Sequence, residues 1–166
     1  QLLCKQGHSV KIESGCGDKA NFTDLDYSSM GAEVVHDKKE IFTCDIIIKI
    51  APPTEDEIDL MKPGQILISA IQLVRAKEVI FKKMLAKGIT AIGFEFLRDD
   101  DGSLPVIRSM SEIAGRASVL IAAEYLSNYN SGKGELFGGI PGIQPTQIVI
   151  IGAGAVGEYA IKAAIG

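Results

Sequence analysis

The run Gln147–Ile151 is apolar after its first residue and leads directly into Gly152-Ala153-Gly154-Ala155-Val156-Gly157. This is the spacing G-x-G-x-x-G, and residues 158–165 favour a helix after it. Between a strand and a helix, the first glycine permits a tight turn, and the second keeps a Cβ out of the approach of a pyrophosphate. The third lets the helix pack close to the strand. The pyrophosphate then faces the positive end of the helix. The sequence therefore predicts the first β-loop-α unit of a dinucleotide-binding Rossmann domain.

This loop makes NAD the expected cofactor, with residues 152–157 as its binding segment. The acidic residue that bonds the ribose of NAD is expected ~20 residues beyond such a loop. That position falls after Gly166, so the residue that selects NAD over NADP lies outside this sequence.

The chain ahead of the loop alternates between expected strands and helices. Residues 45–50, Asp-Ile-Ile-Ile-Lys-Ile, form a β-branched run that is typical of a strand buried on both faces. Residues 65–71 and 89–94 predict two more strands, and residues 74–87 between them have helical spacing. Strands that alternate with helices indicate βαβ units and a mainly parallel sheet. The predicted fold is α/β, with a Rossmann-like parallel-sheet domain before the start of the dinucleotide-binding domain.

A long apolar helix is expected before the domain boundary. Ser109-Met110-Ser111-Glu112 fits a capping box, so the helix is predicted to start there and to run to about Leu126, buried between layers or domains. Residues 128–146 are rich in Gly, Asn and Pro, which favours a linker. We therefore expect a substrate-side domain over residues 1–127, and a linker with the first part of a second domain over residues 128–166.

Charge and composition argue against several classes of function. The net charge is −4, which disfavours a nucleic-acid surface built from clustered Lys and Arg. No apolar run reaches the ~18 residues that a membrane span needs. The three cysteines fit neither a zinc pattern nor a disulfide framework, so a cytoplasmic location is expected. Asp99-Asp100-Asp101 lacks the rest of a calcium loop and is interpreted as a solvated turn, so no metal is expected.

Several stretches together resemble a known family. They include Met110-Ser111-Glu112-Ile113-Ala114-Gly115-Arg116, then Gly138-Gly139-Ile140-Pro141-Gly142, both in order before the glycine loop. Residues 62–67, 87–92 and 101–105 match as well. On these motifs, which extend over nearly the whole chain, the sequence resembles the alanine dehydrogenase and transhydrogenase alpha-subunit N-terminal family, closer to the alanine dehydrogenase branch.

The resemblance implies an NAD-dependent oxidoreductase with two domains facing a cleft. Its reaction would be oxidative deamination of an amino acid, or reductive amination of a 2-oxo acid. It also implies a homo-oligomer and a longer protein. The family's first strand, with its substrate-binding Arg, would precede Gln1, and most of the second domain would follow Gly166. In the family a Ser at the position of Ser111 lies near the cofactor, so Ser111 is a candidate for both helix capping and cofactor binding.

At two positions where the resemblance implies a functional residue, this chain has a different residue. The motif Lys-x-Lys-Glu-Pro aligns with Lys49-Ile50-Ala51-Pro52-Pro53, which places Ala51 at the Lys that binds the substrate carboxylate. The family's catalytic His aligns with Gln72. An amide has no pKa near neutrality and cannot act as a general acid or base. Both positions follow an expected strand, at the sheet edge where α/β folds bind ligands.

Lys49 lies two residues before Ala51, on the same strand face, and is a possible substitute for the missing cation. These exchanges leave three functions open. The protein is either an alanine dehydrogenase-type enzyme with a changed substrate or low activity, a catalytically impaired paralogue that binds a dinucleotide, or a transhydrogenase-like subunit.

Overall fold

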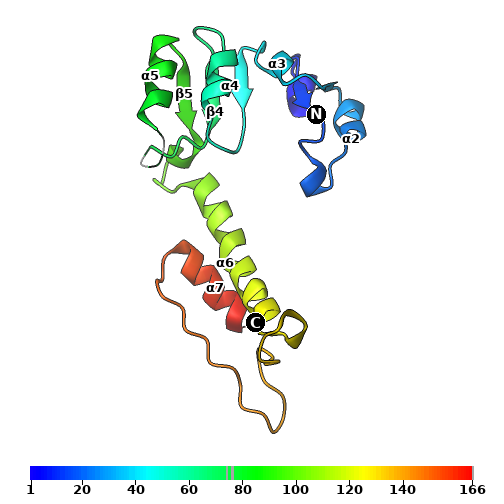
Figure 1. The fold of residues 1–166 in the computed structure, drawn as a ribbon, viewed down its shortest axis with the longest axis vertical. Coiled ribbons are helices and arrows are strands. Elements are labelled where there is room, and N and C mark those ends of the chain that lie inside the picture. Colours follow the sequence, from blue (N-terminus) through cyan, green and yellow to red (C-terminus); the bar gives the residue numbers. More distant parts are fainter. Residues whose placement is uncertain (74, 76, 166) are drawn as a thin grey trace. The chain divides into compact units, whose positions relative to one another are not determined.

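The structure is a computed structural model that describes residues 1–73, 75 and 77–165 (Figure 1). Its contacts divide the chain into two compact units, Gln1–Phe94 and residues 95–166. In this division, the long helix after residue 104 belongs to the same unit as the glycine loop. The predicted boundary after residue 127 stays a prediction for the domains of the whole protein.

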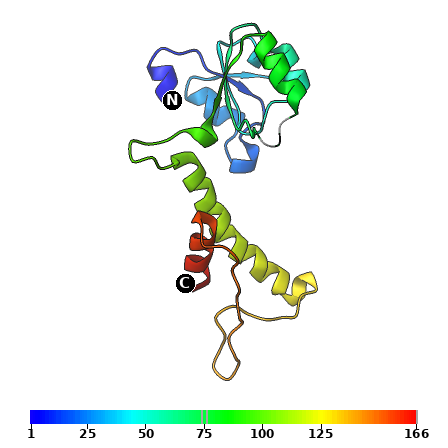
Figure 2. The same cartoon turned by 90° about the vertical axis from the view of Figure 1, so that its left-hand side faces the viewer.

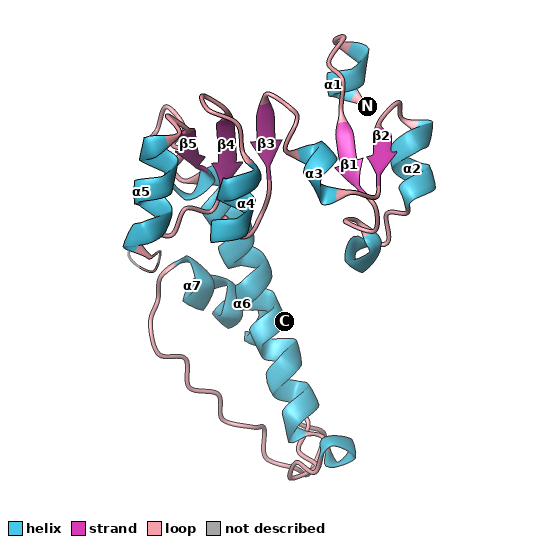
Figure 3. Cartoon of the chain, turned by 45° about the horizontal axis from the view of Figure 1, so that its top comes forward, coloured by secondary structure: helices cyan, strands magenta, loops and turns pink. Residues whose placement is uncertain are grey.

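The first unit contains two parallel sheets, as the alternation of elements predicts. Strand β1 (Lys11–Glu13) pairs with β2 (Glu33–Val35), and β3 (Ile46–Ile48), β4 (Ile66–Ser69) and β5 (Thr90–Gly93) form a second sheet in that order. All neighbouring strands in the two sheets are parallel to each other. Both sheets are visible in Figure 3. The mixed α/β fold with parallel sheets is therefore confirmed.

Short helices precede, connect and follow these strands: α1 (Leu2–Lys5), η1 (Asp18–Ala20), α2 (Asp24–Ser29), α3 (Lys38–Ile41), α4 (Glu55–Leu60), α5 (Glu78–Ala86) and η2 (Phe94–Phe96). The N-termini of α2 and α4 carry capping boxes, with Thr23 and Thr54 as the caps. The helix expected over residues 74–87 starts at Glu78. Its predicted first residue, Val74, lies outside the described residues.

The prediction that residues 45–50 are buried on both faces is wrong for the described chain. Ile47 is 3% exposed and packs with Leu67 of β4, whereas Ile48 is 67% exposed. Helices α4 and α5 cover only one face of β3-β4-β5 (Figure 3) and contribute Ile58 and Met84 to its core. The opposite face of β3 has no such cover among the described residues.

In the second unit, α6 (Pro105–Leu126) and α7 (Ala155–Ile165) lie side by side, and η3 (Asn128–Asn130) follows α6 (Figures 1 and 2). The predicted start of α6 at Ser109 is wrong. Pro105 occupies the first turn, where its fixed φ suits a helix, so Ser109 lies inside α6 and its hydroxyl donates to the Pro105 carbonyl at 3.0 Å.

Two further expectations for this unit differ from the structure. Helix α6 is not buried all round: Gly115 is its one buried described residue, and Ile113 is 69% exposed. Residues 147–151 form no strand, because no described segment pairs with them. A strand needs a hydrogen-bonded neighbour, so an apolar run alone does not make one.

Candidate functional site

The ends of β3 and β4 bring the two substituted family positions to one edge of the sheet. These strands are parallel neighbours, and their pairing continues a little past the strands, with the Lys49 amide donating to the Ile68 carbonyl at 3.0 Å. Ala51 follows β3 and Gln72 follows β4. Both positions therefore lie past the carboxyl ends of adjacent strands, where α/β sheets bind ligands.

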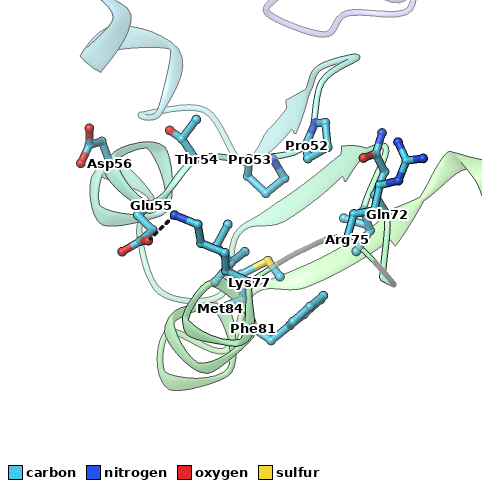
Figure 4. Close-up of a pocket in the computed structure, with 12 residues that line it drawn as sticks. Pro52, Pro53, Thr54, Glu55, Asp56, Gln72, Arg75, Lys77, Phe81 and Met84 are labelled. Atoms are coloured by element: carbon cyan, nitrogen blue, oxygen red, sulfur yellow. Dashed lines mark ion pairs between the residues drawn. The ribbon is translucent and has the colours of Figure 1, made fainter.

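A cavity of about 510 Å³ lies at this edge, between the ends of the two strands and helices α4 and α5 (Figure 4). Its inner surface is apolar and its rim is polar. It is lined by Pro52, Pro53, Thr54, Glu55, Asp56, Ile71, Gln72, Arg75, Lys77, Ile80, Phe81 and Met84. Among the predicted site residues it includes Gln72, whereas Lys49 and Ala51 are not part of its lining. Volumes of roughly 300–1,000 Å³ are usual for small-molecule sites.

Gln72 and Arg75 form one side of the rim (Figure 4). The backbone of Gln72 is left-handed, with φ of 48°, and the Arg75 amide donates to the Gln72 carbonyl at 2.8 Å. This tight turn brings both side chains to the same place. A non-glycine residue with positive φ costs about 1–2 kcal/mol, and such conformations concentrate at ligand sites. Arg75 is a candidate that the family motifs do not indicate.

The other end of the rim carries carboxylates and ammonium groups. Glu55 lies 4.0 Å from the Lys77 Nζ and 3.8 Å from the Lys83 Nζ. The hydrogen bond to Asp59, at 2.7 Å, raises the pKa of Lys83. Lys77 and Lys83 thus already have carboxylate partners. Arg75 has no ion pair with any carboxylate of the described residues.

Lys49 belongs to a second cluster, centred on the carboxylate of Glu57. Glu57 is 7% exposed and accepts from the Lys38 Nζ at 2.7 Å, from the Lys49 Nζ, and from the Thr54 amide at 2.8 Å. Burial alone would raise the pKa of Glu57, but these hydrogen bonds outweigh it and lower that pKa to about 2. The Lys49 ammonium is thus held by Glu57, and a contact between Lys49 and a substrate stays a prediction.

The three glycines of the second unit's loop differ in whether the structure requires a glycine at that position. Gly152 has a φ of 100°, a backbone conformation that residues with a side chain rarely adopt. A Cβ on Gly157 would collide with the Gly152 carbonyl, whose carbon would lie at 2.9 Å. A Cβ on Gly154 would meet nothing within 4 Å, and the backbone of Gly154 has no positive φ. Neither the packing nor the backbone conformation therefore requires a glycine at this position. The arrangement fits a loop whose middle glycine leaves space for a ligand.

Helix α7 begins at Ala155, directly after Gly154, and the Glu158 amide donates to the Gly154 carbonyl at 2.8 Å. Earlier amides of the first turn have no partner within the helix and suit an anion. The loop residues Gly152, Ala153, Gly154, Ala155, Val156 and Gly157 therefore fit the pyrophosphate of a dinucleotide. Among the described residues, no group of three or more His, Cys, Asp or Glu side chains could hold a metal.

Ser111 shares a face of α6 with Gly115, one helical turn further on. A Cβ on Gly115 would lie 2.8 Å from the Tyr159 Cβ and would collide with the Val156 carbonyl, so the two helices touch at Gly115. Ser111 therefore lies on the side of α6 that packs against α7. Its role in cofactor binding stays a prediction.

Comparison with known proteins identifies the family. Residues 1–114 match the family model described as "Alanine dehydrogenase/PNT, N-terminal domain", and residues 118–166 match the corresponding C-terminal domain. The alanine dehydrogenase of Methanococcus maripaludis is 44% identical over 161 residues, which are 96% of this chain and 43% of that protein. That of Staphylococcus saprophyticus is 37% identical over 164 residues, which are 99% of this chain and 44% of that protein.

Solved structures give the same answer. An L-alanine dehydrogenase matches with a TM-score of 0.90 and 38% identity, over 99% of this chain and 45% of that one. A transhydrogenase from Sinorhizobium meliloti matches with a TM-score of 0.80 and 26% identity, over 99% of this chain and 48% of that one. The chain thus spans less than half the length of these relatives. Since the first family model alone covers more than half of its residues, the chain belongs to the alanine dehydrogenase/PNT family.

Proposed function

We propose that the protein containing this chain is an NAD-dependent oxidoreductase of alanine dehydrogenase type. It would oxidatively deaminate an amino acid or, in reverse, reductively aminate a 2-oxo acid. The observation that carries the proposal is the glycine loop, in which Gly154, at the start of α7, has open space around it although neither a close contact nor a positive φ requires a glycine there. The names of the relatives support the reaction type.

NAD, when bound, would take the hydride from the Cα of the amino acid, and the protein would orient the cofactor and substrate. Backbone amides of residues 152–157 would hold the pyrophosphate. Ser111 is proposed as a further contact on the cofactor side. On the substrate side, Gln72 could hold a substrate oxygen by hydrogen bonding, but its amide cannot carry the proton that an imidazole would carry.

The exchanges at Ala51 and Gln72 favour a second candidate, a catalytically impaired paralogue that binds the dinucleotide. A methyl group at residue 51 provides no charge for a substrate carboxylate. The similarity to the Sinorhizobium protein leaves a transhydrogenase-like subunit as a third candidate. A cytoplasmic location and a homo-oligomer remain parts of the same proposal.

The substitution Gly154→Val tests cofactor binding. The open space around Gly154 means that the valine side chain should leave the fold intact while it blocks the pyrophosphate. Calorimetric titration of the full-length protein should show that NAD affinity falls at least tenfold. Ala122→Val, which places the same side chain on the exposed side of α6, should bind NAD normally. Unchanged NAD affinity in Gly154→Val would refute the assignment of the loop.

NADH formation with L-alanine separates the first two candidates. A protein that binds NAD and produces NADH from L-alanine or another amino acid is the proposed enzyme. A protein that binds NAD but turns over no amino acid, and reduces no 2-oxo acid with ammonia, is the impaired paralogue.

A further inference from the structure

The cavity beside β3 and β4 is larger than alanine requires. Its volume of about 510 Å³ is in the range of sites for considerably larger organic ligands. Its apolar surface comes from different elements: Pro53 precedes α4, Ile71 follows β4, and Ile80, Phe81 and Met84 belong to α5 (Figure 4). Such a surface favours an apolar side chain over a methyl group, because each buried methylene contributes about 0.8 kcal/mol.

One cation at the rim is available to an anionic ligand. The other cation in the lining, Lys77, lies 4.0 Å from Glu55, whereas Arg75 has no carboxylate partner among the residues that the structure describes. Arg75 is exposed and lies beside Gln72 at the end of the rim away from Asp56 (Figure 4). A guanidinium donates two parallel hydrogen bonds to a carboxylate, and the neighbouring amide adds polar character at the same place.

The apolar surface and the cationic rim of the cavity therefore match the two ends of one kind of ligand, an apolar side chain and a carboxylate. We propose that the cavity binds 2-oxo acids, and the corresponding amino acids, whose apolar side chain is larger than methyl. Arg75 binds the carboxylate, and Ile80, Phe81 and Met84 contact the side chain. In this assignment Arg75 replaces the carboxylate-binding cation that the family has at the position of Ala51. The inference rests on the proposed function, since it names the substrate class of that enzyme.

The test measures the binding of 2-oxo acids to the full-length protein in the presence of NADH. Calorimetric titration compares pyruvate, 2-oxobutanoate and 4-methyl-2-oxopentanoate. The dissociation constant should fall about threefold to fourfold for each added carbon that reaches the apolar surface. Equal affinities, or tightest binding of pyruvate, would overturn the assignment of the cavity.

Variants of the rim test the role of Arg75. Arg75→Ala should raise the dissociation constant for 4-methyl-2-oxopentanoate about 10- to 100-fold, because a charge-assisted contact is lost. Arg75→Lys should bind with intermediate affinity, because lysine keeps the positive charge but cannot donate two parallel hydrogen bonds to the carboxylate. Lys82→Ala removes one positive charge from α5 outside the cavity and should bind like the unmodified protein. If Arg75→Ala also binds like the unmodified protein, Arg75 is not the carboxylate ligand.

Failure of this inference differs from failure of the proposed function. A protein that binds NADH and aminates pyruvate, but shows neither the size preference nor the Arg75 effect, retains the proposed function and refutes the cavity assignment. A protein that does not bind NADH refutes the proposed function itself. Binding of the longer 2-oxo acids to that protein would still support the cavity assignment.

Discussion

At the scale of single residues, the exchanges at positions 51 and 72 give a prediction about catalysis. The complete protein should oxidise L-alanine far more slowly than its relatives do, because Gln72 cannot move a proton and Ala51 provides no cation. The double variant Ala51→Lys with Gln72→His should raise the rate by about 10²–10⁴, the usual effect of a general acid–base. The positive φ of Gln72 does not hinder this change, since His is among the residues that tolerate it.

The measurement follows NADH formation with L-alanine over a range of pH. The restored rate should depend on pH near 6.5, the ordinary pKa of His, while the single variant Ala51→Lys should gain no such dependence. Alanine turnover by the unmodified protein at the rates of its relatives would show that the alignment or the assigned roles are wrong.

The buried carboxylate of Glu57 gives a second prediction at this scale, on stability. Because its pKa falls from an ordinary 4.5 to about 2, its ion pairs stabilise the fold fully above pH 4.5, and this contribution is lost as the pH falls towards 2. Glu57→Gln should lower the free energy of unfolding by about 2–3 kcal/mol at pH 7, since Lys38 and Lys49 lose their partner.

Urea unfolding of the full-length protein at pH 7 and pH 3 checks this expectation. The difference between Glu57→Gln and the unmodified protein should shrink at the lower pH. Glu33→Gln is the matched control, because it removes an exposed partner of Lys11 and should change the stability by less than about 1 kcal/mol. Equal effects of the two variants would contradict a stabilising role for the Glu57 cluster.

At the scale of elements, sequence patterns predicted those features that depend on neighbouring residues. The alternation of strands with helices and the parallel pairing of the strands agree with the structure. Helix α4 was not predicted, although the spacing from Thr54 to Glu57 has the capping-box form. The start of α6 was misplaced because two signals competed, and Pro105 determined the first turn rather than Ser109.

Features that depend on contacts between residues distant in the sequence could not be predicted from sequence patterns. The cavity brings together residues that follow β3 and residues of α5, and only the packing of these elements shows that Gln72 and Arg75 line the same cavity as α5. The family motifs direct attention to Ala51 and Gln72 instead. The helix after the glycine loop could be predicted because its pattern is local, whereas the role of the loop in cofactor binding stays a prediction.

The contact of α6 with α7 gives a prediction at this scale. Gly115→Ala would be expected to stabilise an isolated helix by about 1 kcal/mol. In this protein the added Cβ would lie 2.8 Å from the Tyr159 Cβ and would collide with the Val156 carbonyl, and such overpacking costs about 1–3 kcal/mol. Gly115→Ala should therefore lower the melting temperature of the full-length protein. Ser109→Ala, on the exposed side of α6, should leave it nearly unchanged, and a stabilised Gly115→Ala would contradict the close contact.

At the scale of the whole molecule, residues 1–166 expose apolar surface that a stable protein would cover. Ile46, Ile48 and Ile50 of the first unit are 49%, 67% and 75% exposed, and Val149 and Ile151 of the second are 85% and 98% exposed. None of the helices described in the structure is long and apolar enough to span a membrane. Exposed apolar patches and unpaired strand-forming segments favour association between chains.

Residues 1–166 produced by themselves should therefore aggregate or bind a hydrophobic dye strongly, whereas the full-length protein should do neither. Size-exclusion chromatography with light scattering checks the first expectation, and dye fluorescence checks the second. Ile48→Lys together with Val149→Lys should reduce the aggregation of residues 1–166, because charges at exposed apolar positions oppose association between chains. Lys39→Ala and Lys82→Ala, at exposed positions on two short helices, should not reduce it. A monodisperse preparation of residues 1–166 that melts cooperatively would show that these apolar side chains need no further cover.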